Sequence, residues 1–477
     1  MGKFRRRDRQ NQQQDLWLRP EELVKGAQDG FYAKLNRVLE KTGFTESVHR
    51  LCEPYYRTGT VSGGRPPVDP AVMFKMLIVG FLEGIGSERG IAARCADSLS
   101  IRRFLHYALT EETPDHSSFT IFRQRLPQDV FESVHCVVLA ALKAHGLLKG
   151  RDLGADSSII EANASLSGLV HRNTEESYRE YVRELARQAG VDPADAAAVA
   201  RFDRKRKGRK TSNKEWHNPD DPDARIGRTK AGACDMVHKP EHIVDLESGA
   251  IIAAEVRPGD AGDSEDFSVR VLAAVERVET LHGEEYGEGT SRVKSVTTDK
   301  GFHEAGELAI IQHATGARTV IGDANAARRR LDLMEPETKA AVQRAARAVK
   351  SQSGKRLLKM RGEKLERGFA HVLDSGGLRR TTLRGRAAIN KRYLCGVIAF
   401  NLCVLMRKLT GWGTPKQTAA AARRLCAAGE RFWHALYRGM ITFLTIWRER
   451  VAENLNFFFL RSCSGVPCAQ PGSSTGS

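Results

Sequence analysis

The sequence lacks the cysteine and histidine spacing of a structural zinc site. Its nine cysteines include no CxxC pair, and no histidine lies at zinc-finger spacing from any of them. A zinc-dependent fold is therefore not expected. An odd number of scattered cysteines in a long chain is typical of reduced, buried thiols in a cytosol-like compartment.

The sequence also has little that would direct the chain to a membrane. The basic residues 1–14 are followed by no apolar segment of the kind that a secretory signal requires. The most apolar run, residues 393–406, is about half the length of a membrane span and contains Asn401. This run predicts a buried helix. We expect a cytoplasmic, nucleoid-associated protein with no membrane partner.

Acidic residues are scarce relative to basic ones. Lys and Arg number 75 against 58 Asp and Glu, which gives a formal net charge of +17 and a pI near 9.6. Such a balance favours a polyanionic partner, nucleic acid ahead of a membrane surface. A solvated basic surface on an ordinary enzyme is the alternative. The apolar fraction of 41% excludes a disordered chain, and 477 residues suggest about two to four domains.

Residues 1–149 predict an all-α N-terminal domain. Asp69 is placed as the N-cap and Pro70 in the first turn of a helix that continues over residues 71–84. This helix is apolar nearly all round, so it should be buried. Short helices follow at tight spacing, which favours a helix-turn-helix-like DNA reader, although small helical bundles look similar. Candidate DNA-binding side chains on these helices are Arg102, Arg103 and Arg123.

Residues 150–410 predict a mixed α/β sheet. The pattern runs from a strand ending at Asp156, through a polar insert at about 165–230, to a β-hairpin over 242–256 and a helix. A second strand ends at Asp299, and a helix and another strand follow. Beyond this domain, a helical segment over 411–461 and a disordered tail over 462–477 are expected.

Two acids stand at the ends of apolar strands. Carboxylates at the ends of neighbouring strands, here Asp156 and Asp299, converge at one edge of a sheet, where they repel each other unless a hard cation neutralises them. The alternative is that each is a turn or helix-cap residue, which is common after strands. The pair, in this strand order and on a basic chain, favours a metal-binding site.

Several blocks of the sequence resemble insertion-sequence transposases of the DDE superfamily. RPPVDPAVMFKMLIVGFLEGIGSERGIAARCADSLSIRRFL and TPDHSSFTIFRQRL resemble the family's helical N-terminal domain. LGADSSIIEANAS, HIVDLESGAIIAAEVRPGDAGDSEDF, TTDKGF and RGEKLERGFAHV resemble blocks of its catalytic core. The resemblance covers about residues 15–410. It implies a ribonuclease-H-like mixed-sheet core, with an all-α N-terminal domain and a helical C-terminal segment.

The resemblance implies a catalytic and metal-binding triad of Asp156, Asp299 and Glu366, with Phe369 as the aromatic residue that follows the glutamate. Glu363, one helical turn earlier, is the rival third ligand. The match is looser in this last block. The family often places Tyr, Arg and Lys around the glutamate. Here the tyrosine is missing, and no lysine follows at the usual distance, where Arg379 or Arg380 could substitute. Arg361 precedes Glu366 by five residues rather than four.

The implied activity is two-metal phosphoryl transfer with Mg²⁺ or Mn²⁺, in which DNA ends are cut and joined to target DNA. Lys300 and Arg361 would hold flanking phosphates. The partners would be the double-stranded DNA of transposon ends and target, bound by a homodimer. A nuclease without strand transfer and a catalytically inactive DNA-binding relic are the alternatives.

A basic cluster in the polar insert is a further candidate for DNA contact. It could follow a phosphate backbone, with Trp216 stacking on a base, although charge runs are more often solvated loops. Its members are Arg204, Lys205, Arg206, Lys207, Arg209 and Lys210.

Overall fold

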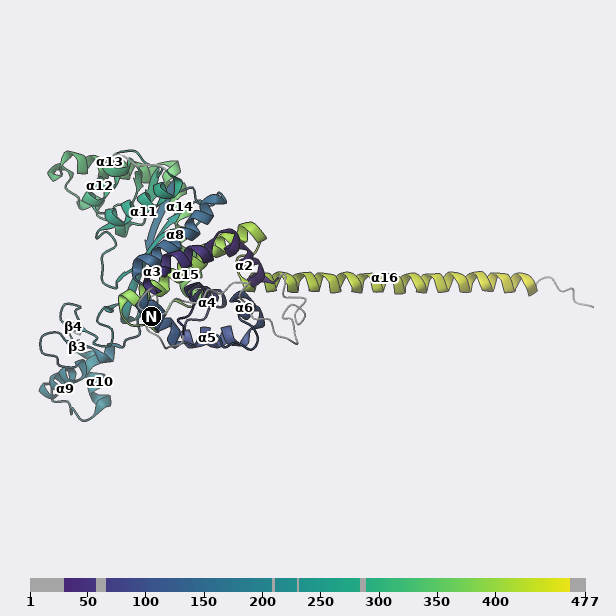
Figure 1. The fold of residues 1–477 in the computed structure, drawn as a ribbon, viewed down its shortest axis with the longest axis horizontal. Helices are drawn as coiled ribbons and strands as arrows, with labels where there is room; N and C mark the ends of the chain where they lie inside the picture. Colours follow the sequence, from purple (N-terminus) through teal and green to yellow (C-terminus); the bar gives the residue numbers. More distant parts are fainter. Residues whose placement is uncertain (1–29, 57–65, 208–210, 230, 284–288, 464–477) are drawn as a thin grey trace, which may run out of the picture. The chain divides into compact units, whose positions relative to one another are not determined.

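The computed structural model describes residues 30–56, 66–207, 211–229, 231–283 and 289–463, and Figure 1 shows the arrangement of their helices and strands. The chain divides into two compact units, Met1–Pro415 and Lys416–Ser477. The predicted boundary at residue 411 lies close to this division. Most of the predicted tail, from residue 464 on, lies outside the described residues.

The N-terminal part of the first unit is helical, as predicted. Asp69 caps α4 by accepting a hydrogen bond from the backbone N of Ala71 at 2.8 Å, and Gly84 ends the helix in the left-handed region at φ 74°. All residues from 70 to 82 are buried, which confirms the helix that is apolar on all sides. The helices are α2 (Phe31–Lys41), α3 (Phe44–Tyr56), α4 (Pro70–Glu83), α5 (Glu88–Asp97), α6 (Leu99–Phe104), α7 (Ser117–Arg125) and α8 (Gln128–Ala144).

A mixed sheet follows, which confirms the predicted α/β class. Strand β6 lies between β1 and β7 and is antiparallel to both, whereas β8 and β9 continue the sheet from β1 as parallel strands. The predicted hairpin is β6–β7, and β6 begins eight residues before the expected start at His242. The strands of this sheet are β1 (Asp152–Ser157), β2 (Ile160–Glu161), β5 (Arg225–Arg228), β6 (Cys234–Asp245), β7 (Ile251–Pro258), β8 (Ser295–Thr297) and β9 (Arg318–Val320).

Five helices pack around the sheet and its edges. Helix α11 contacts β7 and α8, and α12 and α13 pack on each other and on β9. Helix α14 crosses β1, β6, β8 and β9. These helices are α11 (Phe267–His282), α12 (Ala305–Thr315), α13 (Pro336–Lys350), α14 (Gln352–Phe369) and α15 (Arg386–Thr410).

Helix α15 joins the helical region to the sheet. It packs against α4, α8 and β7, and one continuous hydrophobic core runs from Phe31 to Met406. Asn401 fixes this contact, because its side chain accepts a hydrogen bond from the backbone N of Ile251 at 2.9 Å and donates one to the backbone O of Ile251 at 2.8 Å. Residues 386–421 are long and apolar enough to cross a membrane, but 72% of their most apolar window is buried in the structure. The predicted buried helix is therefore confirmed.

The polar insert forms a small lobe with its own cores. Figure 1 shows its helices and short strands together, away from α12 and α13. Two apolar clusters hold the lobe, one around Trp216 and one around Val182 and Ala186. Its elements are β3 (Val170–His171), α9 (Tyr178–Gln188), α10 (Ala196–Lys205) and β4 (Trp216–His217).

Short helical turns and one long helix complete the described chain. The turns are the 3₁₀ segments η2 (Leu166–Gly168), η3 (Lys300–Phe302), η4 (Ala326–Arg328) and η5 (Leu331–Leu333) and the π-helical segment η6 (Ala370–Ser375). Helix α16 (Pro415–Cys463) has 49 residues.

Candidate active site

The parallel pairing of β1 and β8 brings two predicted acids to the same edge of the sheet. Gly154 pairs with Thr297, so extending the same register by two residues sets Asp299 beside Asp156. Asp156 is the penultimate residue of β1, and Asp299 caps η3 by accepting a hydrogen bond from the backbone N of Gly301 at 3.0 Å. The predicted convergence of these two carboxylates is a direct consequence of parallel strands.

Arg361 on α14 contacts both carboxylates. One of its terminal guanidinium nitrogens lies 2.9 Å from Asp156 Oδ1 and 3.8 Å from Asp299 Oδ2. Its side chain is only 16% exposed, and its Nε is buried without a hydrogen-bond partner among the described residues. A single cation therefore already lies between the two acids in this structure.

Burial changes the acidity of Asp156. The pKa of its carboxyl is raised to about 6, mainly by removal from water and also by the charges of Asp299 and Asp263, against the opposing effects of Arg361 and the backbone N of Ser157. A carboxyl with a pKa near neutrality carries a proton part of the time unless a cation is close. The site thus favours a positive charge next to Asp156.

A third acid lies in this neighbourhood, and it was not among the predicted site residues. Asp263 Oδ1 accepts a hydrogen bond from the Ser157 hydroxyl at 2.7 Å and pairs with Lys239 Nζ at 2.7 Å. The loop after β7 carries it to the end of β1. Only the crowding of acids in the sequence GDAGDSED could have pointed to this residue.

Gly301 allows the acids to approach. A Cβ atom at this position would lie 3.0 Å from Asp263 Oδ2 and 3.3 Å from Asp299 Oδ1. Both contacts are tighter than ordinary van der Waals contact. Glycine therefore makes room for the carboxylates of two different loops.

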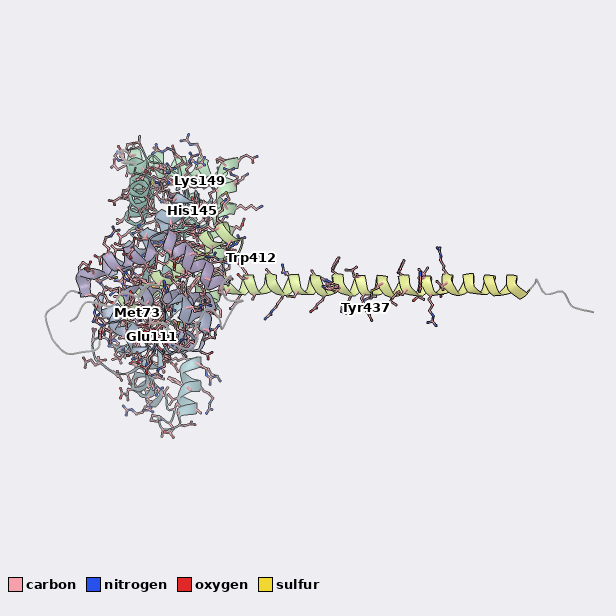
Figure 2. All side chains as sticks on the ribbon, turned by 45° about the vertical axis from the view of Figure 1, so that its right-hand side comes forward. Met73, Glu111, His145, Lys149, Trp412 and Tyr437 are labelled. Atoms are coloured by element: carbon pink, nitrogen blue, oxygen red, sulfur yellow. The ribbon has the colours of Figure 1, made fainter. Side chains whose placement is uncertain are left out.

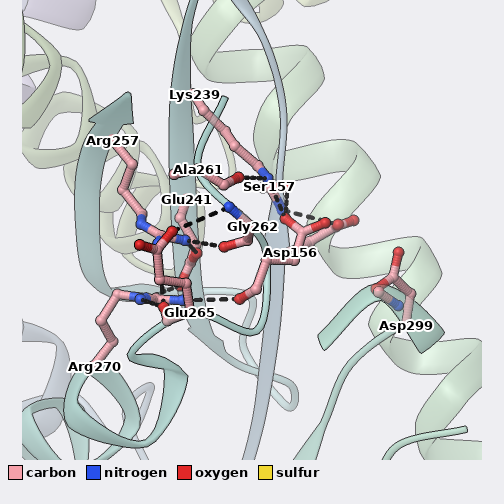
Figure 3. Close-up of polar contacts among 12 residues, drawn as sticks. Asp156, Ser157, Lys239, Glu241, Arg257, Ala261, Gly262, Glu265, Arg270 and Asp299 are labelled. Carbon is pink, nitrogen blue, oxygen red and sulfur yellow. Dashed lines mark hydrogen bonds and ion pairs between the residues drawn. The ribbon is translucent and has the colours of Figure 1, made fainter. Parts of the chain in front are cut away.

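Buried ion pairs support the strand ends behind the site. Glu241 on β6 is 3% exposed and lies 2.6 Å from Arg270 Nε and 3.4 Å from a terminal nitrogen of Arg257 (Figure 3). Arg257 also donates to the backbone O of Gly262 at 2.8 Å, and Arg270 donates to the backbone O of Asp263 at 3.0 Å. These bonds fix the loop that carries Asp263.

The predicted third ligand lies on the helix that carries Arg361. Glu366 is exposed on α14, and its side chain makes no hydrogen bond or ion pair among the described residues. The rival Glu363 is also exposed and pairs with Arg367 at 3.2 Å. Across the described ranges, no group of three Asp, Glu, His or Cys side chains is arranged to hold a metal ion. The structure thus brings two of the three predicted acids together.

The end of α14 is anchored next to Asp156. Phe369 stacks on His242 with ring centroids 4.1 Å apart and an interplanar angle of 7°. His242 is the residue of β6 that pairs with Asp156, and its Nε2 lies 2.6 Å from the Tyr393 hydroxyl. Burial lowers the pKa of His242 to about 3, so the imidazole is neutral and shares a hydrogen bond with the tyrosine hydroxyl. Phe369, predicted from its position after Glu366, fixes the helix to the sheet.

The predicted phosphate-binding residues next to the acids differ in their surroundings. Lys300, immediately after Asp299, is exposed, and its aliphatic carbons lie beside Gly322. Arg361 is held by the two acids. Only Lys300 therefore presents a free surface to a ligand in this conformation.

Two of the predicted DNA-binding arginines hold the protein itself. Arg102 is 8% exposed and donates to several backbone carbonyls, including Ala108 O at 2.6 Å. Arg123 is 6% exposed and forms an ion pair with Glu88. These contacts point to a structural role, because a buried guanidinium cannot reach a phosphate without leaving its partners. Arg103 is half-buried.

The basic cluster of the insert is divided in the same way. Arg204, Lys205 and Lys207 are exposed, whereas Arg206 is paired with Asp203 at 2.7 Å and contacts Tyr178. The remaining predicted members, Arg209 and Lys210, lie outside the described residues.

The predicted stacking of a base on Trp216 is wrong for this conformation. The indole is 4% exposed and packs edge-to-face against Tyr178 and Tyr181, with centroids 5.4 and 5.3 Å away. The lobe has few other large apolar residues, so the tryptophan forms its core. In a polar segment, a single tryptophan can either fill a small hydrophobic core or stack on a nucleic-acid base, and the sequence does not distinguish the two.

Two of the three predicted ligands, Asp156 and Asp299, are placed to bind a divalent cation. Two carboxylates face one position that a guanidinium nitrogen now occupies, and carboxylate oxygen is the donor that Mg²⁺ and Mn²⁺ prefer. Burial raises the pKa of Asp156, and a positive charge close to this carboxylate lowers the pKa. A cation would supply that charge.

Comparison with known proteins identifies the helical region. No curated protein matches the chain. Among solved structures, the "Mos1 transposase paired-end complex with left transposon end" matches with 10% identity and a TM-score of 0.18, covering 69% of this chain and 85% of that chain. A TM-score this low does not establish a shared fold. The family model described as "Transposase domain (DUF772)" matches residues 19–125, so the N-terminal helical region is similar to this transposase domain.

Proposed function

We propose that this protein is a DNA transposase that cuts DNA ends and joins them to target DNA. One observation carries the proposal: Asp156 and Asp299 meet at the ends of adjacent parallel strands, in a chain that also has a transposase domain. The net charge of +17 agrees with a DNA partner.

The catalytic core of this proposal is ribonuclease-H-like. The strand arrangement supports this proposed core. Strands β7, β6 and β1 are neighbours and antiparallel, whereas β1, β8 and β9 are neighbours and parallel. The central strand and its parallel neighbour carry the two acids.

Asp156 and Asp299 would hold Mg²⁺ or Mn²⁺, with Glu366 as the proposed third ligand. When bound, the metal would stabilise negative charge on the reacting phosphate and increase the acidity of an attacking water or hydroxyl. The neutral His242 and the stacked Phe369 keep α14 beside β1. Asp263, held by Lys239 and Ser157, positions the loop that closes the other side of the site.

Arg361 would have two different partners in this scheme, the acids without metal and a DNA phosphate with metal. In the structure it neutralises the acids, and with a cation in place the same guanidinium would be free to hold a DNA phosphate next to the site. Lys300 is exposed on the same edge and would contact the phosphate backbone. Double-stranded DNA, from transposon ends and target, is the proposed partner.

The deciding experiment is Mg²⁺-dependent cleavage and joining of DNA that carries the element's own ends. The wild type is compared with Asp156→Ala and Asp299→Ala, and with Asp332→Ala as a control, because Asp332 is exposed and its ion pair is with Arg330 at 2.7 Å. Joined product that is lost in both site variants and kept in the control supports the proposal. Cleavage without joining identifies a nuclease. DNA binding with neither reaction identifies an inactive relic and overturns the catalytic proposal.

A further inference from the structure

Helix α16 carries a continuous stripe of large apolar side chains. They recur at intervals of three and four residues, the spacing that places residues on one face of a helix. Each is at least half exposed, from 50% at Leu436 to 71% at Trp433. Figure 2 shows side chains, among them Tyr437, standing out along this helix. The stripe residues are Trp433, Leu436, Tyr437, Met440, Phe443, Leu444 and Trp447.

We infer that this stripe is a self-association surface, and that α16 pairs in antiparallel orientation with α16 of a second copy of the chain. The inference goes beyond the proposed function, since it concerns an interaction that needs neither DNA nor metal. Three observations carry it: the spacing of the stripe, its area and the charges at its two ends.

The spacing favours another helix as the occupant. Within the stripe, Trp433, Tyr437, Met440, Leu444 and Trp447 follow one another at intervals of four, three, four and three residues. This alternation is the seam of a two-helix coiled coil, in which each side chain inserts between residues of the facing helix. A membrane surface selects only for an apolar face and imposes no such regular seam.

The area is sufficient for a stable pair. Four of the seven stripe residues are aromatic, and each such ring buries about 150–250 Å² when fully covered. With the exposed fractions given above, the stripe offers roughly 800 Å² per helix, which is about what each partner contributes to a stable protein interface. A 49-residue helix is about 70 Å long, so the stripe fits within it with residues to spare on its N-terminal side.

The charges favour the antiparallel orientation. Glu430 precedes the stripe and Arg448 follows it, and their separation of 18 positions makes about five full turns, so both lie on the same edge of the stripe. A twofold axis across an antiparallel pair brings the same edge of each helix together. With Tyr437 of one copy opposite Met440 of the other, Glu430 meets Arg448 at both ends of the interface. A parallel pair would bring Glu430 level with Glu430 and would leave both charges without this partner.

Sedimentation velocity of the full chain without DNA, over a concentration series, tests the inference. We expect a dimer in the wild type. For Leu444→Glu the dissociation constant of the dimer should rise at least about 100-fold, because a charge would be buried in the seam. Ile446→Glu is the matched control. Ile446 is 49% exposed against 51% for Leu444 and lies on another side of the helix, so its change should leave the dimer intact. Circular dichroism checks that each variant keeps its helix.

The orientation is tested by exchanging charges. Glu430→Arg and Arg448→Glu should each weaken the dimer by roughly three- to tenfold at low salt, and the double variant should restore it. Cys426 supplies an independent test. It is exposed and lies on the same stripe, so oxidation would join two copies in a parallel pair, whereas an antiparallel pair separates the two thiols by about 35 Å.

Each other outcome overturns the inference. A wild type that stays monomeric at all concentrations excludes self-association. A monomer that co-floats with anionic lipid vesicles, and loses this binding in Leu444→Glu, would assign the stripe to a membrane surface. A Cys426 disulfide that forms rapidly would exclude the antiparallel orientation. Because DNA and metal are absent, none of these results depends on whether the protein is a transposase.

Discussion

Arg361 and Asp156 form the central ion pair of the site, with 2.9 Å between a guanidinium nitrogen and Asp156 Oδ1. The pair joins α14 to the end of β1, two elements separated by about 200 residues in the chain. Its consequences can be measured through acidity, metal affinity and stability.

Substitution Arg361→Gln should raise the pKa of Asp156 further, because the guanidinium lowers it in the wild type. The acid limb of the pH profile of DNA cleavage should then move to higher pH, because the Asp156 carboxyl loses its proton only at higher pH. Cleavage rates at several pH values measure this shift. Arg330→Gln is the control, because Arg330 pairs with the exposed Asp332 away from the site. An unchanged midpoint would contradict the assigned contact.

The pKa of Asp156 also predicts a pH-dependent stability. In the folded state it is about 6, against an ordinary value of 3.8 for an aspartate in water. The folded state therefore holds this proton more tightly, so the stabilising contribution is present below pH 4 and is lost as pH rises through 6. Asp156→Asn should consequently be more stable than the wild type at pH 8, by at most about 3 kcal/mol, and similar to it at pH 4. Urea unfolding at the two pH values measures the difference. Equal unfolding curves at pH 8 would contradict the burial of this charge.

Substitution Gly301→Ala should weaken metal binding, because its Cβ would push apart the carboxylates of Asp263 and Asp299. We expect the Mg²⁺ concentration for half-maximal cleavage to rise by about tenfold, with little loss of folding stability. Titration of activity with Mg²⁺ measures the effect. Gly362→Ala is the control, since a Cβ there meets no atom within 4 Å.

The choice between Glu366 and Glu363 can be made by the same substitution at each position. If Glu366 is the third ligand, Glu366→Gln should reduce cleavage at least about 100-fold, whereas Glu363→Gln should keep most of it. Both residues are exposed on α14, so neither change should affect folding. Thermal unfolding of both variants provides the control. The opposite order of activities would assign the role to Glu363.

The hydroxyl of Tyr393 should contribute to stability rather than to chemistry. It shares a hydrogen bond of 2.6 Å with His242 Nε2 in a fully buried position. Tyr393→Phe leaves the imidazole nitrogen without this partner and should destabilise the fold by about 1–3 kcal/mol. Urea unfolding measures the loss, with the half-buried Tyr181→Phe as the comparison. A variant as stable as the wild type would show that the bond contributes nothing.

Much of the architecture could be predicted because local patterns specify it. Asp69 and Pro70 mark the start of α4, and apolar residues on all its sides require burial. Apolar runs predict strands that end at Asp156 and Asp299, whereas β1 ends one residue after Asp156 and β8 two residues before Asp299; the parallel register still makes the two side chains neighbours. Periodicity and capping are properties of short segments, so they can be read without the fold.

Tertiary structure decided which polar side chains have partners. Arg102, Arg123 and Trp216 belong to residue types that bind DNA, but the folded chain buries each of them against its own carbonyls, acid or aromatic rings. Likewise, Asp263 reaches the end of β1 only because the buried Glu241 and its arginines fix a long loop. The sequence alone determined the elements and the acids that end their strands. Burial and pairing depend on residues distant in the chain, and therefore only the folded structure decided them.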